Sequence, residues 1–233
     1  MRLLIRIVIF IMGIQSYVFS DECVILLHGL ARSSSSFNRM ESALKEKGYF
    51  TVNYNYPSRK YGIEKLAKES IDNALVRCPE NSKIHFVTHS LGGILVRQYL
   101  STGKIKNLGR VVMLGPPNKG SQVVDKLKKV PGFVWFNGPA VKELGTDSMS
   151  IPASLGPSNI YVGIIAGTKS INPILSSMLP DPDDGKVSVD NTKLAGMTDH
   201  ITLPVAHPFL MKNDEVIREV ICFLQNGKFS QKE

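Results

Sequence analysis

The stretch from Lys83 to Ser101 constrains the fold more than any other part of the sequence. It reads KIHFVTHSLGGILVRQYLS. Its first half is rich in β-branched and aromatic residues, which favours a strand, and its second half spaces apolar residues three and four apart, which favours a helix. Ser90 stands between the halves, followed closely by Gly92 and Gly93. The sequence therefore predicts a strand, a sharp turn at Ser90 and a helix.

A serine at such a turn suits nucleophilic chemistry. A nucleophile needs a hydroxyl held clear of the sheet, small neighbours, and amide N–H groups aimed at a developing oxyanion. Gly92 leaves room for the helix to approach the turn, and the N–H of Leu91 lies at the positive end of that helix. Thr88 departs from the G-x-S-x-G pattern at its first glycine and predicts altered packing of the strand. The alternative is a serine that only caps a buried helix.

The remaining chain alternates predicted strands with predicted helices. Strands are expected at 23–27, 49–56, 84–88, 110–114, 160–166 and 201–205, and helices at 37–44, 63–76, 91–101 and 213–224. Pro204 favours an edge position for the last strand. This alternation predicts an α/β fold, a three-layer α/β/α sandwich with a mainly parallel sheet. With 233 residues, 43% of them apolar, the chain is expected to form one domain over residues 21–233 after a leader.

A serine nucleophile requires a base and an acid that orients it. His207 follows the last predicted strand, at the carboxyl edge of the sheet, and is favoured as the base over His200, which precedes that strand. His85 and His89 are expected to be poor bases that pack or bond locally. Asp184 is the favoured acid because Gly185 permits a tight turn, and Asp183 is the second choice. The order Ser90, Asp184, His207 is the order of α/β-hydrolases.

The first strand is followed at once by His28-Gly29-Leu30, and the backbone of Leu30 is expected to supply a second oxyanion donor beside that of Leu91. His28 and Gly29 are therefore expected next to the substrate. Residues 123–159 are broken by prolines and contain the apolar run PGFVWF. Phe133 and Trp135 are expected there to contact an acyl chain in a short cap or pocket lining, and ordinary core beneath a long loop is the alternative.

The N-terminus predicts export. Residues 1–20 combine a basic start, a short apolar run and a small residue at position 20, which is typical of a cleaved signal peptide. A retained anchor is the alternative, but the run is shorter than the roughly 20 residues that span a bilayer. Without the two arginines of this leader the net charge falls from +8 to about +6. The lysines at 126, 128 and 129 lack interleaved aromatics, so we expect no nucleic-acid partner and only a weak attraction to anionic lipid surfaces.

The sequence contains three cysteines, too few and too scattered for a disulfide framework or a metal site. Cys23 and Cys222 are expected to be small core residues, and Cys78 to be the more exposed one. At most one pair could form in an oxidising compartment. No metal and no cofactor is expected.

Nearly the whole mature chain resembles the α/β-hydrolase fold lipases and esterases, in particular small bacterial lipase-like proteins with some similarity to GPI-inositol-deacylase-type hydrolases. The resemblance rests on the segments VILLHGLARSSSSF, HFVTHSLGGILVRQYL, VVMLGPPNKGS, DDGKVSVDNTKL and DHITLPVAHPFLM. It implies Ser90, Asp184 and His207 as a triad with Leu30 and Leu91 as oxyanion amides. The region 123–159 is short for a large lid.

The sequence thus predicts an exported serine ester hydrolase of the lipase or carboxylesterase type, acting on small-molecule or lipid esters through an acyl-enzyme. An acyltransferase, amidase or thioesterase could use the same triad. A non-catalytic lipid-binding or interaction protein on a hydrolase scaffold is the alternative from another class.

Overall fold

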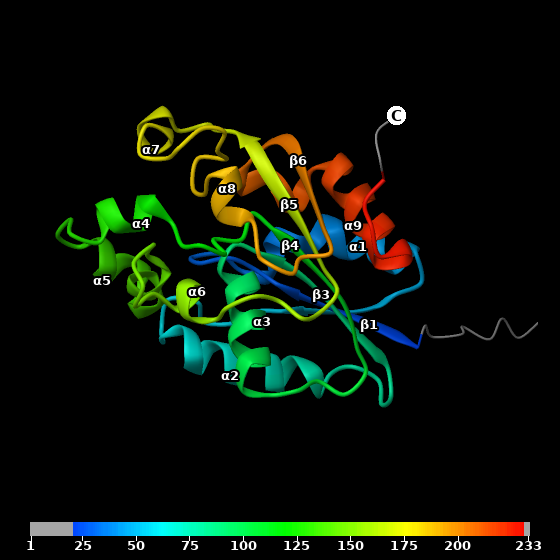
Figure 1. The fold of residues 1–233 in the computed structure, drawn as a ribbon. Coiled ribbons are helices and arrows are strands. Elements are labelled where there is room, and N and C mark those ends of the chain that lie inside the picture. The colour runs from blue at the N-terminus through cyan, green and yellow to red at the C-terminus, as the bar shows by residue number, and fades with distance from the viewer. Residues whose placement is uncertain (1–20, 231–233) are drawn as a thin grey trace, which may run out of the picture.

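The fold is a three-layer α/β/α sandwich around one parallel sheet, as predicted (Figure 1). In this computed structural model, residues 21–230 are described, so the predicted signal peptide at 1–20 lies outside the described residues. The sheet has six strands in the order β2-β1-β3-β4-β5-β6. Their bounds are Glu22–Leu27 (β1), Phe50–Tyr54 (β2), Lys83–His89 (β3), Leu108–Leu114 (β4), Val162–Lys169 (β5) and Asp199–Ala206 (β6). β6 is an edge strand, as Pro204 predicted.

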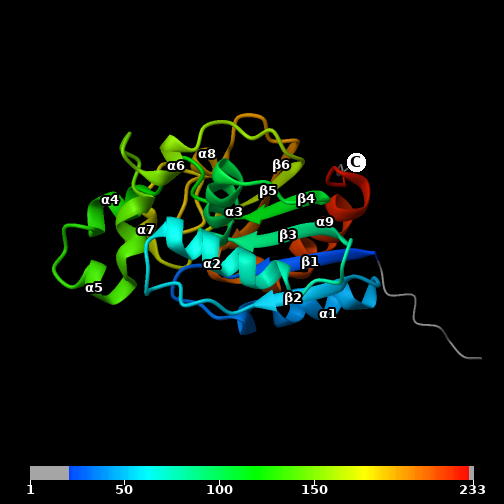
Figure 2. The ribbon, with the colours of Figure 1, turned by 90° about the horizontal axis from the view of Figure 1, so that it is seen from below.

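Long helices cover both faces of the sheet. Helices α2 (Ile63–Leu75) and α3 (Leu91–Thr102) pack on one face, and α1 (Asn38–Glu46) and α9 (Asp214–Asn226) on the other (Figures 1 and 2). The side chains of β1 alternate between the two cores, since Ile25 and Leu27 join the first cluster while Val24 and Leu26 join the second. Period-two alternation within a wholly apolar strand is what burial on both faces requires.

Short helices lie in the connections between the strands and the long helices, some of them beyond the carboxyl end of the sheet (Figure 2). They are η1 (Ser34–Phe37), α4 (Gln122–Leu127), α5 (Phe133–Asn137), η2 (Pro139–Leu144), α6 (Ile151–Ser154), α7 (Pro173–Ser176), α8 (Val189–Thr192) and η3 (His207–Lys212). Loops at this end of a parallel sheet are where α/β proteins place their ligands. Among residues 21–230, no helix combines the length and apolar character needed to cross a bilayer.

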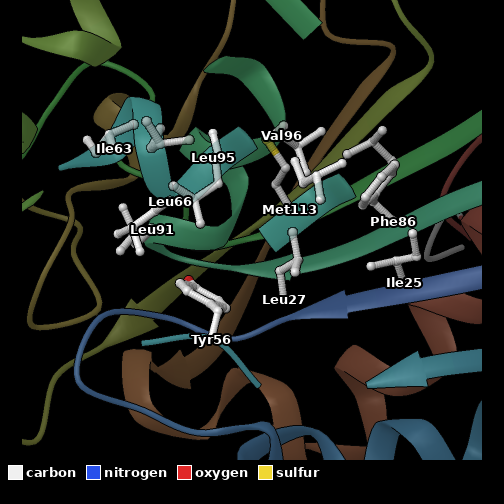
Figure 3. Close-up of a cluster of buried hydrophobic side chains, with 14 of the residues drawn as sticks. Ile25, Leu27, Tyr56, Ile63, Leu66, Phe86, Leu91, Leu95, Val96 and Met113 are labelled. Carbon is white, nitrogen blue, oxygen red and sulfur yellow. The ribbon is translucent and has the colours of Figure 1, made fainter. Parts of the chain in front are cut away.

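The core beneath α2 and α3 supports the turn at Ser90. The cluster beneath α2 and α3 contains Leu27, Tyr56 and Leu91, so the end of β1 and the start of α3 share one apolar layer (Figure 3). All three side chains are at least 97% buried. Because close-packed interiors deform little, this layer fixes the position of the turn at Ser90 relative to the loop that follows β1.

A disulfide joins Cys23, at the start of β1, to Cys78, just after α2, with their Cα atoms 5.9 Å apart. The expectation that Cys23 is an unpaired core residue is therefore wrong, although its sulfur is fully buried as predicted. Cys222 lies on α9 with a partly exposed side chain, so its predicted burial is also wrong. The apolar pattern around each cysteine could not distinguish packing from pairing, because the bonded partner comes from a different element.

Candidate active site

Ser90 occupies a strained turn between β3 and α3. Its φ is 52° and its ψ is −118°, a conformation that non-glycine residues rarely adopt. The Ser90 amide donates to the Leu114 carbonyl at 2.9 Å, which ties the turn to β4. A strained residue held by its surroundings at the carboxyl end of a sheet is typical of a nucleophile elbow.

Two glycines let other segments approach this turn. A Cβ on Gly92 would lie 2.4 Å from the Leu27 carbonyl oxygen, so the predicted close approach of the helix requires glycine. A Cβ on Gly29 would lie 2.7 Å from Nδ1 of His89 and 3.3 Å from Cβ of Ser90. The loop after β1 therefore lies directly against the turn at Ser90.

The backbone around Ser90 offers two amides for an oxyanion. Leu91 is the first residue of α3, so its N–H is one of the donors that a helix leaves without an intrahelical partner. Leu30 follows Gly29 in the loop against Ser90, and its half-buried side chain packs on the core beneath α3. Both predicted oxyanion amides thus lie on segments that flank Ser90.

Thr88, where the motif has a threonine in place of glycine, is fully buried in β3. Its hydroxyl donates to the Val112 carbonyl at 3.4 Å. A Cβ on Gly93 would lie 3.3 Å from that hydroxyl oxygen, so the space for Thr88 comes from the glycine five residues later. The crowding expected at Thr88 is relieved from the side of α3.

Asp184 and His207 are in direct contact. Nδ1 of His207 donates to Oδ2 of Asp184 at 2.6 Å, and both side chains are buried. The other carboxylate oxygen accepts from the amides of Lys186 and Val187 at 2.9 Å each, within a turn in which Gly185 has a φ of +91°. In the neutral imidazole a proton on Nδ1 leaves Nε2 with a lone pair, the state that a general base needs.

Gly115, at the end of β4, accommodates this pair. A Cβ there would lie 2.9 Å from Oδ2 of Asp184 and 3.0 Å from Nδ1 of His207. Gly115 also has a φ of +54°, which favours glycine. The sequence pattern did not single out Gly115 as a site residue, although the Gly-Pro-Pro turn after a strand marks an unusual backbone.

Asp183, the second choice for the acid, points elsewhere. One carboxylate oxygen accepts from the Gly185 amide at 2.6 Å and the other from the Ser176 hydroxyl at 2.5 Å. It holds the loop between β5 and Asp184 closed. The structure therefore brings Asp184 to His207 and keeps Asp183 in the loop.

His89 lies close to His207 without sharing its geometry. Nε2 of His89 donates to the His207 carbonyl at 3.1 Å, and the two rings lie 4.5 Å apart. Burial lowers the pKa of His89 well below its ordinary value, and the neighbouring His207 adds to the shift, so the ring is neutral. His89 was expected to bond locally, and its partner is instead 118 residues away.

His28 supports the loop that carries Leu30. Its Nδ1 donates to the Gly29 carbonyl at 2.9 Å, and its Nε2 accepts from the Tyr56 amide at 3.3 Å. The Tyr56 ring stacks on it at 4.2 Å, and the Tyr56 hydroxyl donates to the His28 carbonyl. Burial lowers the pKa of His28. Both ring nitrogens are therefore engaged with protein atoms, and the predicted position of His28 next to the substrate stays a prediction.

His200, the rejected base, lies at the start of β6 and is half-buried, and its Nε2 pairs with the Thr192 hydroxyl at 2.9 Å. Its position at the amino end of β6 agrees with its rejection.

The aromatic residues predicted to contact substrate lie on α5. Phe133 is half-buried and packs against the core beneath α3, whereas Trp135 is 88% exposed. Phe136 is also exposed, with the Arg59 guanidinium over its ring. Trp135 therefore lies on the surface, and its predicted contact with an acyl chain stays a prediction.

Within residues 21–230 no group of three or more histidine, cysteine or acidic side chains is arranged to hold a metal ion. The described site consists of Ser90, the Asp184–His207 pair and the backbone amides. These groups can carry out general base and nucleophilic chemistry.

Comparison with known proteins identifies the fold of the chain. No family model matches the sequence, and no curated protein matches it. Among solved structures, the mature form of the Bacillus licheniformis lipase BlEst2 is similar, with a TM-score of 0.64 and 21% identity over 87% of this chain and 91% of that one. The metagenomic carboxyl esterase MGS0156 has a TM-score of 0.65 and 19% identity over 81% and 65% of the two chains.

The Staphylococcus hyicus lipase is a third similar structure, with a TM-score of 0.55 and 12% identity over 84% of this chain and 90% of that one. Together with the six-stranded parallel sheet, these likenesses show that the chain has the α/β-hydrolase fold. The predicted resemblance to lipases and esterases is thereby confirmed for the fold. Its finer part, the similarity to GPI-inositol-deacylase-type hydrolases, stays a prediction.

Proposed function

We propose that this α/β-hydrolase-fold protein is a serine ester hydrolase. The observation that carries the proposal is the buried contact between Asp184 and Nδ1 of His207, at the same end of the sheet as the strained Ser90. His207 takes the proton of Ser90 through Nε2 as the hydroxyl attacks the ester carbonyl, and Asp184 holds the imidazole tautomer. The alcohol leaves with that proton, and water then clears the acyl-enzyme.

The amides of Leu30 and Leu91 stabilise the tetrahedral oxyanion. One such donor is commonly worth about 3 kcal/mol of barrier lowering. Here the donors are held by the shared core beneath α3 and by the hydrogen bonds that join His28 to the Gly29 carbonyl and to the Tyr56 amide after β2. The groups are thus organised before any substrate arrives, which is the condition for electrostatic stabilisation.

Lipid-like esters are the proposed substrates. Exposed apolar side chains occupy loops and short helices that follow the carboxyl ends of the strands: Trp135 is 88% exposed, Ile174 is 71% exposed, and Phe209, two residues after His207, is 49% exposed. Apolar groups in such positions suit an acyl chain or the surface of a lipid aggregate. The exposed Lys126 and Lys129 on and just after α4 would add a weak attraction to anionic lipid.

We also propose that the protein is exported. The Cys23–Cys78 disulfide supports this, because structural disulfides persist mainly in oxidising compartments. Secretion of a fusion in which residues 1–20 precede a reporter, lost when the two arginines and the apolar run are replaced, would test the leader.

The hydrolase is tested with p-nitrophenyl esters of increasing acyl length, using the wild-type protein and Ser90→Ala. The control is Ser101→Ala, which removes an exposed hydroxyl at the other end of α3. We expect Ser90→Ala to abolish turnover and labelling by a fluorophosphonate, and Ser101→Ala to retain both. Product analysis with an added alcohol separates hydrolysis from acyl transfer. Wild-type protein that neither turns over any ester nor reacts with the probe would refute the proposal.

A further inference from the structure

The loop that follows β2 carries two buried hydroxyl groups that hold the loop containing Leu30. Tyr56 is 3% exposed and Ser58 is 4% exposed. The Ser58 hydroxyl accepts from the Ala31 amide at 3.1 Å, and the Tyr56 hydroxyl donates to the His28 carbonyl. These two hydrogen bonds lie on either side of the Leu30 amide along the chain. The loop after β2 therefore holds the Leu30 loop at both ends.

Ala31 has a strained backbone that depends on this support. Its φ is +55°, in the left-handed region, which a residue other than glycine adopts only where its surroundings hold it there. The hydroxyl of Ser58 provides that support by binding the Ala31 amide. Because Ala31 follows Leu30 directly, relaxation of its backbone would also move the Leu30 peptide.

The peptide group between Gly29 and Leu30 is fixed from its carbonyl side. The Gly29 oxygen accepts from Nδ1 of His28 at 2.9 Å and from the Arg32 amide at 3.3 Å. A trans peptide is planar, so its C=O and N–H groups point in opposite directions. Fixing the Gly29 oxygen therefore fixes the direction of the Leu30 N–H. Within residues 21–230 no protein atom accepts from that N–H, which leaves it available to an oxyanion.

Tyr56 also determines which nitrogen of His28 can donate. Its amide donates to Nε2 of His28 at 3.3 Å, so the proton of the neutral ring lies on Nδ1, which bonds to the Gly29 oxygen. The two rings stack with their centroids 4.2 Å apart. Tyr56 itself belongs to the apolar core beneath α3 (Figure 3). Contacts therefore run without a break from this core to the Leu30 peptide.

We propose that Ser58 and Tyr56 are positioning residues for the oxyanion hole: their hydroxyl groups hold the peptides on either side of the Leu30 N–H, so that it points at the developing oxyanion. This inference rests on the proposed ester hydrolase and adds two residues that act through Leu30. Because the oxyanion forms only on the way to the tetrahedral intermediate, loss of either hydroxyl should lower kcat and leave KM nearly unchanged.

The experiment removes each hydroxyl and leaves the rest of the side chain in place. Ser58→Ala and Tyr56→Phe are the test variants, and Ser58→Thr is the conservative variant that keeps a hydroxyl at this position. The control is Ser82→Ala. Ser82 is 5% exposed, and its hydroxyl donates to the Pro79 carbonyl at 2.8 Å just before β3, at the opposite end of the sheet from Ser90. Thermal unfolding shows whether each variant is folded.

A pair of inhibitors separates oxyanion binding from general binding in the substrate pocket. When Ser90 adds to the carbonyl carbon of 1,1,1-trifluoro-2-decanone, His207 takes the hydroxyl proton and the carbonyl oxygen becomes an oxyanion. The corresponding alcohol, 1,1,1-trifluoro-2-decanol, has the same chain but no carbonyl group to attack. The inhibition constants of both compounds are measured for every variant beside kcat and KM for a p-nitrophenyl ester.

We expect kcat to fall about tenfold in Ser58→Ala and in Tyr56→Phe, because a displaced donor keeps part of an interaction whose complete removal costs about 10²- to 10³-fold. KM should stay within about twofold of wild type. The inhibition constant of the ketone should rise by the same factor as kcat falls, and that of the alcohol should not change. Ser58→Thr and Ser82→Ala should keep kcat within about threefold of wild type, since the first retains an acceptor and the second lies far from the site.

Folded Ser58→Ala and Tyr56→Phe variants with wild-type kcat and ketone affinity, while Ser90→Ala abolishes hydrolysis, would refute the positioning role and leave the ester hydrolase intact. Equal losses of affinity for the ketone and the alcohol would also refute it, because the substrate pocket as a whole would then have changed. The same holds for an equal loss of kcat in Ser82→Ala. A wild-type protein that neither hydrolyses the ester nor binds the ketone would overturn both proposals.

Discussion

Replacing Asp184 by asparagine tests the candidate triad most directly, because the structure fixes how the new amide must sit. Oδ1 of Asp184 accepts two backbone N–H groups, and Oδ2 accepts Nδ1 of His207. In Asp184→Asn the amide oxygen must keep facing the two N–H groups, because the flipped amide would lose two hydrogen bonds worth about 1 kcal/mol each. The new NH2 group then faces His207.

That orientation forces His207 into the wrong tautomer. Nδ1 must accept from the amide, so the imidazole proton moves to Nε2, which can no longer take the proton of Ser90. The negative charge that stabilises the imidazolium is lost as well. We expect kcat to fall by about 10⁴-fold, equivalent to roughly 5.5 kcal/mol, the effect known for this substitution in a serine protease triad.

The neighbouring Asp183→Asn is the matched control. Asp183 is equally buried, but its oxygens accept from the Gly185 amide and from the Ser176 hydroxyl, and a hydroxyl can also accept from an amide NH2 group. We expect kcat within about threefold of wild type in this variant, since its polar partners can be retained. Steady-state kinetics with a p-nitrophenyl ester provide the assay, and thermal unfolding shows whether each variant is folded. Similar losses in both variants, or a folded Asp184→Asn within tenfold of wild type, would contradict the assigned roles.

Three further predictions concern stability. Replacing both Cys23 and Cys78 by alanine opens a loop with a sequence separation of 55, and chain entropy alone predicts a loss of about 4 kcal/mol in the free energy of unfolding, measured with urea. Burial lowers the pKa of His85 from 6.5 to about 4, so between these two pH values only the unfolded chain binds a proton at this residue. The free energy of unfolding of the wild-type protein should therefore fall by up to about 3 kcal/mol as the pH drops from 6.5 to 4. The fall should be smaller in His85→Gln, which lacks the titrating group. Gly92→Ala places a Cβ 2.4 Å from a backbone oxygen and should cost at least about 3 kcal/mol, whereas Gly103→Ala, with its nearest atom at 3.5 Å, should cost under about 0.5 kcal/mol in the same titration.

The sequence predicted the sheet well because each strand has a local sequence signal. The strands after β1 appear as short apolar or β-branched runs bounded by turn residues, and the predicted strand positions agree with the observed strands to within a few residues. The closing helix was equally clear, since Asn213 caps it and Gly227 ends it with a φ of +76°. Local signals of this kind need no knowledge of the partner segments.

Features that depend on two distant segments were missed. The partner of Cys23 lies 55 residues away, and the partner of His89 lies 118 residues away, so neither pairing leaves a trace in local periodicity. The contact between Asp184 and His207 was anticipated only because chain order and the turn at Gly185 restricted the choices.

Burial distinguishes the proposed base, His207, from the other two histidines of the candidate site. Both ring nitrogens of His28 form hydrogen bonds with main-chain groups. The neutral ring of His89 has one N–H, which donates to the His207 carbonyl. Burial lowers the pKa of both rings, so both remain neutral near pH 7. A proton on His89 would place a positive charge 4.5 Å from the imidazolium that His207 must become, and would oppose its formation. In the proposed mechanism, neutral neighbours therefore favour transfer of the Ser90 proton to His207, which Asp184 contacts directly.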